Sequence, residues 1–232
     1  MPTDENAGVD RRQFLHTAVA GVVAGMATHW GFWPARDRGR AMRAGTTRAT
    51  ALEELLAGNR RYAANQPTST GQDLAARRER TLEKQEPFAA VLACADSRMP
   101  VELVFDRSIG EIFVVRVAGN IVTPEIIGSL EYATAVLGIR ALLVLGHTHC
   151  GAVKAAMKAD AVPGQISALY AHIRPAVDRS DGDAEKATEI NARMQADLLR
   201  SSSTVIRQAT TAAKLEVAAG VYDLSSGRVA IC

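Results

Sequence analysis

The sequence of 232 residues has few cysteines, little net charge and no long hydrophobic run, and each shortage excludes a class of protein. The three cysteines, Cys94, Cys150 and Cys232, are too few and odd in number for a disulfide framework. A formal net charge of +2 provides no general attraction to nucleic acid or to a membrane surface. The apolar stretch from Thr17 to Ala27 is too short to cross a bilayer as a helix. We therefore expect no nucleic-acid partner and no stable membrane span in the mature protein.

The N-terminus has the form of a signal peptide, because a charged start precedes that short apolar stretch. Arg11 and Arg12 are adjacent and are followed closely by apolar residues, which is similar to a twin-arginine export signal. The alternative, a buried or amphipathic N-terminal helix, is disfavoured by the many small residues. We expect residues 1–27 to be the signal and residues 28–48, which lack an apolar period, to be a linker. The bacterial protein is then exported, already folded, to the periplasm or another extracytoplasmic space.

From residue 49 onward, short apolar runs alternate with stretches of helical spacing. The apolar runs predict a buried strand over residues 88–93, a second, β-branched strand over residues 112–117 and a third strand over residues 141–145. Helices are predicted over residues 49–65, 123–137, 151–159 and, in two pieces, 184–213. A final strand pair is predicted over residues 215–222 and 228–231. Apolar strands that alternate with helices predict an α/β domain, with a mainly parallel central β-sheet flanked by helices.

Two short polar motifs follow the first and third predicted strands. The first contains Cys94, Asp96 and Arg98, and the second contains His147 and Cys150. In parallel sheets, functional residues gather at the carboxyl ends of the strands. Zinc accepts two thiolates and one imidazole, and keeps a fourth position for water or a carboxylate. By spacing alone the motifs leave two interpretations open, a metal site or cysteines packed as small hydrophobic residues.

Four motifs, C-x-D-S-R, R-V-A-G-N, S-L-E-Y-A and G-H-x-x-C-G-A-V, closely resemble those of the β-carbonic anhydrase family. The resemblance extends from about residue 49 to the C-terminus, so it covers nearly all of the expected mature domain, residues 49–232. It implies a Zn²⁺ enzyme that reversibly hydrates carbon dioxide to bicarbonate and a proton, by attack of a zinc-bound hydroxide. It also implies a homodimer or homotetramer.

The resemblance also implies the roles of individual residues. The zinc ligands would be Cys94, His147 and Cys150. Asp96 and Arg98 match the catalytic pair of the family, in which the aspartate becomes a zinc ligand in a closed state. The substrate pocket, built in the family from both chains of a dimer, would contain Gln85, Phe113, Tyr132 and Gly151.

Some features stay open at this stage. Val91-Leu92-Ala93 replaces the Trp-x-Gly of the bicarbonate-inhibited subclass, so we expect the subclass without that inhibitory site. His149 is interpreted either as a further ligand or proton shuttle or as a solvent-facing loop residue, and the role of Arg116 is undetermined. Two rival functions remain. One is hydrolysis of carbonyl sulfide or carbon disulfide, and the other is a non-catalytic zinc or bicarbonate sensor, which would not need the Asp–Arg pair.

Overall fold

The computed structural model describes residues 48–232. The signal peptide predicted for residues 1–27, and all but the last residue of the predicted linker, lie outside this part of the chain. None of the helices described here has the length and the apolar character that a bilayer span requires.

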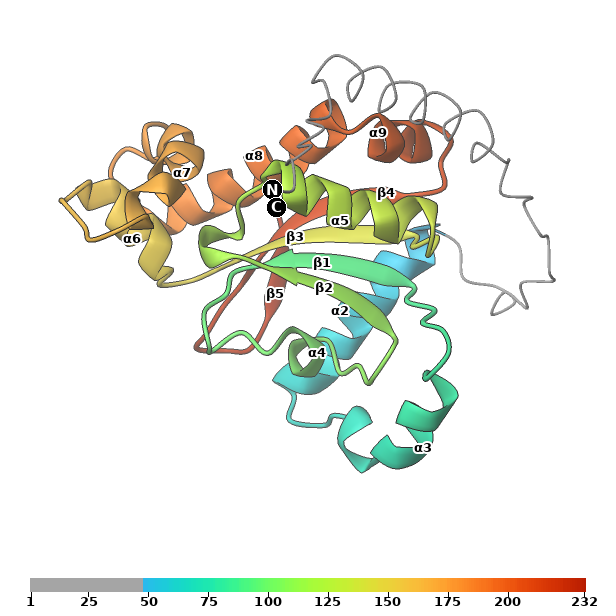
Figure 1. Cartoon of the computed structure of the whole chain (residues 1–232). Coiled ribbons are helices and arrows are strands. Elements are labelled where there is room, and N and C mark those ends of the chain that lie inside the picture. Colours follow the sequence, from blue (N-terminus) through green and yellow to red (C-terminus); the bar gives the residue numbers. More distant parts are fainter. Residues whose placement is uncertain (1–47) are drawn as a thin grey trace, which may run out of the picture. The chain divides into compact units, whose positions relative to one another are not determined.

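A five-stranded sheet in the order β2-β1-β3-β4-β5 forms the centre of the domain (Figure 1). The strands are β1 (Ala89–Ala93), β2 (Ile112–Arg116), β3 (Ala141–His147), β4 (Glu216–Tyr222) and β5 (Val229–Ile231). The first four run parallel, and β5 pairs antiparallel with β4. Every residue of β1 and β3 is buried, which explains why both sequences are apolar except for His147, the last residue of β3. The predicted mainly parallel sheet and its terminal strand pair are confirmed.

Helices cover both faces of this sheet (Figure 1). One face packs against α2 (Arg48–Ala63) and α4 (Val101–Val104). The other packs against α5 (Pro124–Ala135), α8 (Ala184–Ser202) and α9 (Thr204–Thr211). The remaining helices are α3 (Leu74–Arg80), which buries no residue, and α6 (Gly151–Lys158) and α7 (Tyr170–Val177), beyond the carboxyl ends of the strands. Successive strand residues alternate between the two apolar cores, as the pleat requires.

Helix α2 is held tightly against the rest of the domain. The buried side chain of Asn59 donates hydrogen bonds to the carbonyl oxygens of Val104 and Gly227, at 3.1 and 2.9 Å, and accepts one from the backbone N–H of Val229 at 2.8 Å. The neighbouring residue, Gly58, lies so close to α4 that a Cβ atom would stand 1.9 Å from the carbonyl oxygen of Phe105. A side chain at residue 58 therefore cannot be accommodated without moving backbone.

We expect Gly58→Ala to lower the free energy of unfolding by about 1–3 kcal/mol, because the added methyl group meets backbone rather than a flexible side chain. Gly128→Ala, in α5, is the matched control, since no atom lies within 4 Å of its added Cβ. The control should be stabilising by about 0.5–1 kcal/mol through helix propensity. Urea unfolding of both variants measures the difference, and equal effects would contradict the close approach of α2.

Candidate metal centre

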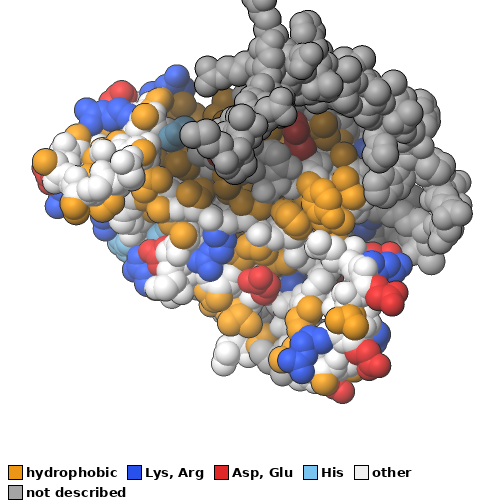
Figure 2. Space-filling view, in the orientation of Figure 1, with side chains coloured by type: hydrophobic (Ala, Val, Ile, Leu, Met, Phe, Trp, Pro, Cys, Tyr) orange, Lys and Arg blue, Asp and Glu red, His pale blue; other side chains and the backbone are white. Residues whose placement is uncertain are grey.

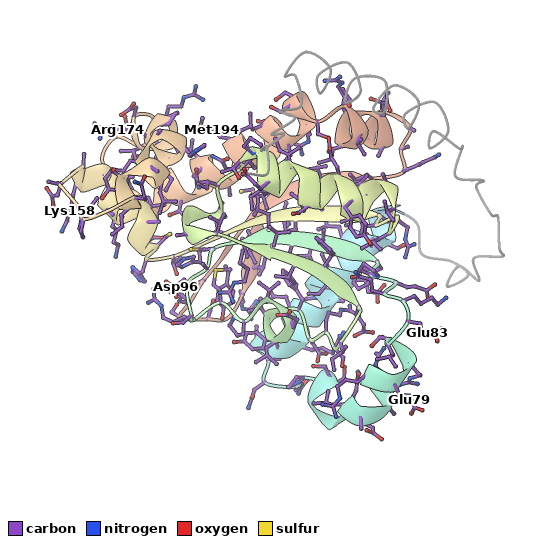
Figure 3. The ribbon with its side chains drawn as sticks, viewed as in Figure 1. Glu79, Glu83, Asp96, Lys158, Arg174 and Met194 are labelled. Carbon is purple, nitrogen blue, oxygen red and sulfur yellow. The ribbon has the colours of Figure 1, made fainter. Side chains whose placement is uncertain are left out.

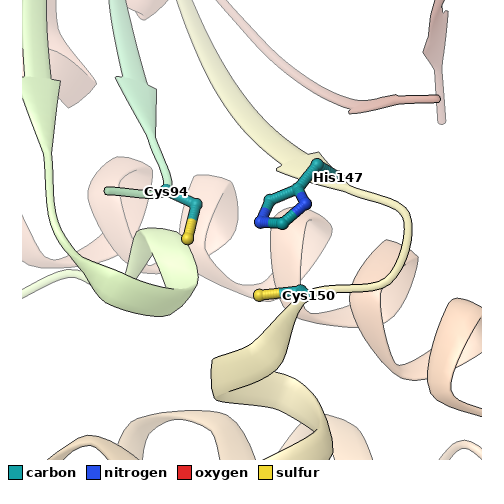
Figure 4. A group of neighbouring side chains, drawn as sticks. All are labelled: Cys94, His147 and Cys150. Carbon is teal, nitrogen blue, oxygen red and sulfur yellow. The ribbon is translucent and has the colours of Figure 1, made fainter. Parts of the chain in front are cut away.

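Three side chains that the sequence predicted as metal ligands converge at the carboxyl end of the sheet. Cys94 directly follows β1, His147 is the last residue of β3, and Cys150 immediately precedes α6. Strands β1 and β3 are parallel neighbours with Ala93 opposite Leu145, so both motifs leave the sheet side by side. The two sulfur atoms and an imidazole nitrogen lie within 4.8 Å of one another (Figure 4).

The chemistry of these donors fits a zinc ion. His147 is fully buried, and Cys94 and Cys150 are only 4% and 2% exposed. The Nδ1 atom of His147 donates to the carbonyl oxygen of Thr148 at 2.9 Å, which fixes the ring, while its buried Nε2 atom has no hydrogen-bond partner. A buried nitrogen without a partner is costly, whereas a cation beside it would use its lone pair. Two thiolates and one neutral imidazole are a ligand set typical of zinc.

The two buried sulfurs affect each other's pKa in opposite directions. The Cys150 thiol donates a hydrogen bond to Cys94, and this bond lowers the pKa of Cys94 well below its usual range, against the opposing effect of burial. Interactions with His147 and with the backbone N–H of Gly119 lower it further. The same bond to Cys94 raises the pKa of Cys150. Of the two sulfurs, Cys94 is therefore the one whose thiolate form these neighbouring donors favour.

Asp96 lies beside the cluster and is held by Arg98. Its Oδ1 atom accepts from the backbone N–H and the Nε of Arg98 at 2.9 and 3.0 Å, and its Oδ2 atom accepts from a terminal guanidinium nitrogen at 2.8 Å. These hydrogen bonds lower the pKa of Asp96, so the side chain is a carboxylate at neutral pH. The Oδ2 atom is also 3.8 Å from the Nε2 of His147, which places the carboxylate next to the metal ligands. Figure 3 shows Asp96 in the loop beyond the carboxyl ends of the strands.

Arg116, whose role the sequence left undetermined, holds the main chain of the same loop. Its Nε donates to the carbonyl oxygen of Cys94 at 3.0 Å, and a terminal nitrogen donates to that of Asp96 at 2.5 Å. One guanidinium group thus bridges the main chain on both sides of Ala95. Sequence reasoning missed this function because nothing in a motif shows which carbonyl groups an arginine reaches.

The loop between β3 and α6 is fixed by backbone contacts. The N–H of Thr148 donates to the carbonyl oxygen of Tyr222 at 2.9 Å, and that of His149 donates to Glu185 at 2.9 Å. His149 has a left-handed backbone with φ of 57°, and its side chain is 64% exposed. Its ring faces Glu185, with 3.5 Å between Nδ1 and Oε1, and it is not part of the ligand cluster. The solvent-facing interpretation therefore describes its position.

The predicted substrate-pocket residues fall into two places. Gly151 is the first residue of α6 and adjoins the ligand cluster. Phe113 and Tyr132 are paired, with ring centroids 6.4 Å apart, but Phe113 is opposite Ala90 near the amino end of the strands. Gln85 is exposed and precedes β1 at that same end. One chain therefore brings only Gly151 to its own cluster.

Comparisons with known proteins find similar sequences and folds among carbonic anhydrases. The family model described as "Carbonic anhydrase" matches residues 89–229. The carbonic anhydrase of Mycolicibacterium smegmatis is 34% identical over 189 residues, 77% of this chain and 90% of the relative. Carbonic anhydrase 2 of Mycobacterium tuberculosis is 31% identical over 194 residues, 80% of this chain and 93% of the relative. The solved structure of Coccomyxa β-carbonic anhydrase in complex with acetazolamide has a TM-score of 0.61 at 27% identity, covering 78% of this chain and 85% of that one.

We expect the purified chain to hold about one zinc ion, and Cys150→Ser to lose most of it, because a hydroxyl group is a far weaker zinc ligand than a thiolate. Cys232→Ser is the matched control, since this third cysteine lies outside the cluster. Metal analysis after gel filtration gives the stoichiometry. Equal zinc in the two variants would show that Cys150 is not a ligand.

Proposed function

The chain is a carbonic anhydrase of the β-family, and from that premise we propose that it reversibly hydrates carbon dioxide to bicarbonate and a proton with the aid of one zinc ion. The observation that carries the proposal is the meeting of Cys94, His147 and Cys150 next to a carboxylate that Arg98 holds in place. A zinc ion used only for structure would not need an oriented carboxylate beside its ligands.

The residues that would hold the ion are Cys94, His147 and Cys150. When bound, zinc supplies a nucleophile near neutral pH by lowering the pKa of a water molecule. The chain's own contribution is to present two sulfurs and one ring nitrogen from a rigid sheet edge and to exclude solvent from them, since all three side chains are buried. Carbon dioxide is apolar, so a site that excludes water also favours its entry.

Asp96 is the residue we propose to orient the reaction. As a carboxylate it can only accept hydrogen bonds, so its Oδ2 atom can hold the proton of the attacking oxygen and direct a lone pair at carbon. Arg98 binds both carboxylate oxygens in a rigid fork, which fixes the direction of that acceptor. If this pair separates, Asp96 becomes free to act as a further metal ligand, as the family's closed state implies.

We propose that Gln85, Phe113 and Tyr132 serve the site of a second copy, in a homodimer or homotetramer. Tyr132 and Val136 are 47% and 65% exposed although both are apolar or aromatic. Tyr132 lies against Phe113 of β2, which is an edge strand of the sheet. Hydrophobic side chains also gather on the face of the domain shown in Figure 2. Two Sordaria macrospora β-carbonic anhydrases with a related fold are described as tetrameric.

We also propose that the chain is exported by the twin-arginine route. The support is the sequence alone, namely adjacent Arg11 and Arg12 followed by a short apolar stretch. Export in the folded state would let the thiolates receive zinc in a reducing compartment before they meet an oxidising one.

Stopped-flow measurement of carbon dioxide hydration tests the proposed reaction. We expect fast hydration by zinc-loaded protein, loss of the rate after chelation, and recovery when zinc is returned. Carbonyl sulfide and carbon disulfide should be supplied to the same protein. A metal-replete protein that hydrolyses only the sulfur compounds would replace the proposal by its rival, and one that acts on none of them would favour a sensor.

Arg98→Ala tests the role of the Asp96–Arg98 pair. We expect turnover to fall roughly a hundredfold, because a misdirected group near the reacting atoms costs about that much, while zinc content stays near that of the unchanged protein. Arg174→Ala is the control, since Arg174 also forms an ion pair with a nearby aspartate, the exposed Asp178, at 3.0 Å. An equal loss of zinc and turnover in Arg98→Ala would show that Arg98 is mainly structural.

A further inference from the structure

A tight turn after β2 places a backbone N–H against one of the metal-ligating sulfurs. The turn contains the short helix η2 (Ala118–Asn120), and within it the N–H of Gly119 donates to the Sγ atom of Cys94 at 3.3 Å. Gly119 has a φ of +76°, and an added Cβ would lie 2.6 Å from the side chain of Ile173. A larger residue here would be strained by the left-handed backbone and would displace Ile173, so glycine at this position of the R-V-A-G-N motif favours the turn that brings an amide to the sulfur.

Two buried amide side chains on α8 form hydrogen bonds with the backbone of this turn. Asn191 and Gln195 are four residues apart on the helix and are 1% and 3% exposed. The Nδ2 of Asn191 donates to the carbonyl oxygen of Gly119 at 2.9 Å. The Oε1 of Gln195 accepts from the backbone N–H of Val122 at 2.8 Å. The helix therefore holds the turn at two points on either side of Asn120.

The two amides also hold each other. The Nε2 of Gln195 donates to the Oδ1 of Asn191 and to the carbonyl oxygen of His172, both at 3.2 Å. All four polar side-chain atoms of the pair therefore have partners. Burying two amides is costly unless every group is satisfied, and an apolar pair would fill this space without that requirement. Unlike an apolar pair, the two amides fix the orientation of the turn through their hydrogen bonds to its backbone.

We propose that Asn191 and Gln195 are positioning residues of the metal centre, which hold Gly119 so that its N–H donates to the sulfur of Cys94. The inference rests on the proposed zinc site and adds to it a second layer of residues that acts through the turn. An N–H bonded to a thiolate withdraws part of its charge. With two thiolates around one ion, this withdrawal leaves the ion more strongly polarising than it would otherwise be.

The test uses the whole chain loaded with ¹¹³Cd in place of zinc. A hydrogen bond to a metal-bound sulfur transmits a scalar coupling between cadmium and the amide proton, so we expect a correlation from cadmium to the N–H of Gly119. Asn191→Leu and Gln195→Met each remove one hydrogen bond to the turn and replace the amide by an apolar side chain of similar volume. Each should abolish or weaken the correlation. Thr188→Val is the control, because the hydroxyl group of this buried residue of α8 donates to the carbonyl oxygen of Ala184 in its own helix and not to the turn. It should leave the correlation intact.

Hydration kinetics supply the second readout. Loss of an outer partner of a metal ligand reduces activity by roughly tenfold or more, so we expect that fall in kcat for Asn191→Leu, with zinc content unchanged and Thr188→Val at the wild-type rate. Cadmium bound by the unchanged protein without a correlation to Gly119 would overturn the inference and leave the metal site standing. A correlation of unchanged strength in both variants would also overturn it. Failure to bind cadmium at all would instead refute the metal site itself.

Discussion

Negative charge on buried sulfur, at the carboxyl ends of β1 and β3, is the constraint on which the rest of this structure depends. A buried thiolate is unfavourable unless donors or a cation surround it. The chain supplies part of that surrounding itself, through the Cys150 thiol and the N–H of Gly119. The unpartnered Nε2 of His147 faces the same point. These groups converge on one place where a soft divalent cation would complete the balance of charge.

Several elements around the ligand cluster each hold one part of it in place. The parallel sheet sets the distance between the two ligand motifs, because β1 and β3 are hydrogen-bonded neighbours. Arg116 holds the main chain of the loop after β1, and Arg98 holds the carboxylate that the loop presents. Helix α8 supports the other side, where Glu185 holds the loop before α6 and the amides of Asn191 and Gln195 hold the turn after β2. Rigid support of this kind is what a reaction with a small, weakly bound gas requires.

Much of this architecture is predictable from the sequence, for identifiable reasons. The central strands β1 and β3 are almost entirely apolar, so their sequences predict buried parallel strands. The metal ligands and the Asp96–Arg98 pair lie in short motifs at the carboxyl ends of these two strands. The supporting contacts are not predictable in this way. Asn191 and Gln195 lie 72 and 73 positions along the chain from the turn residues to which they bond. In addition, the sequence does not show whether a polar residue on a helix is buried. Helices α4 and α7 were also missed, the first because it is only 4 residues long and the second because it contains Pro175.

The most direct test of the central claim is X-ray absorption at the zinc edge of the purified chain. The account predicts two sulfur ligands at about 2.3 Å together with nitrogen or oxygen ligands at about 2.0–2.1 Å. A first shell of nitrogen and oxygen alone, or a single sulfur, would contradict a centre built from Cys94, His147 and Cys150.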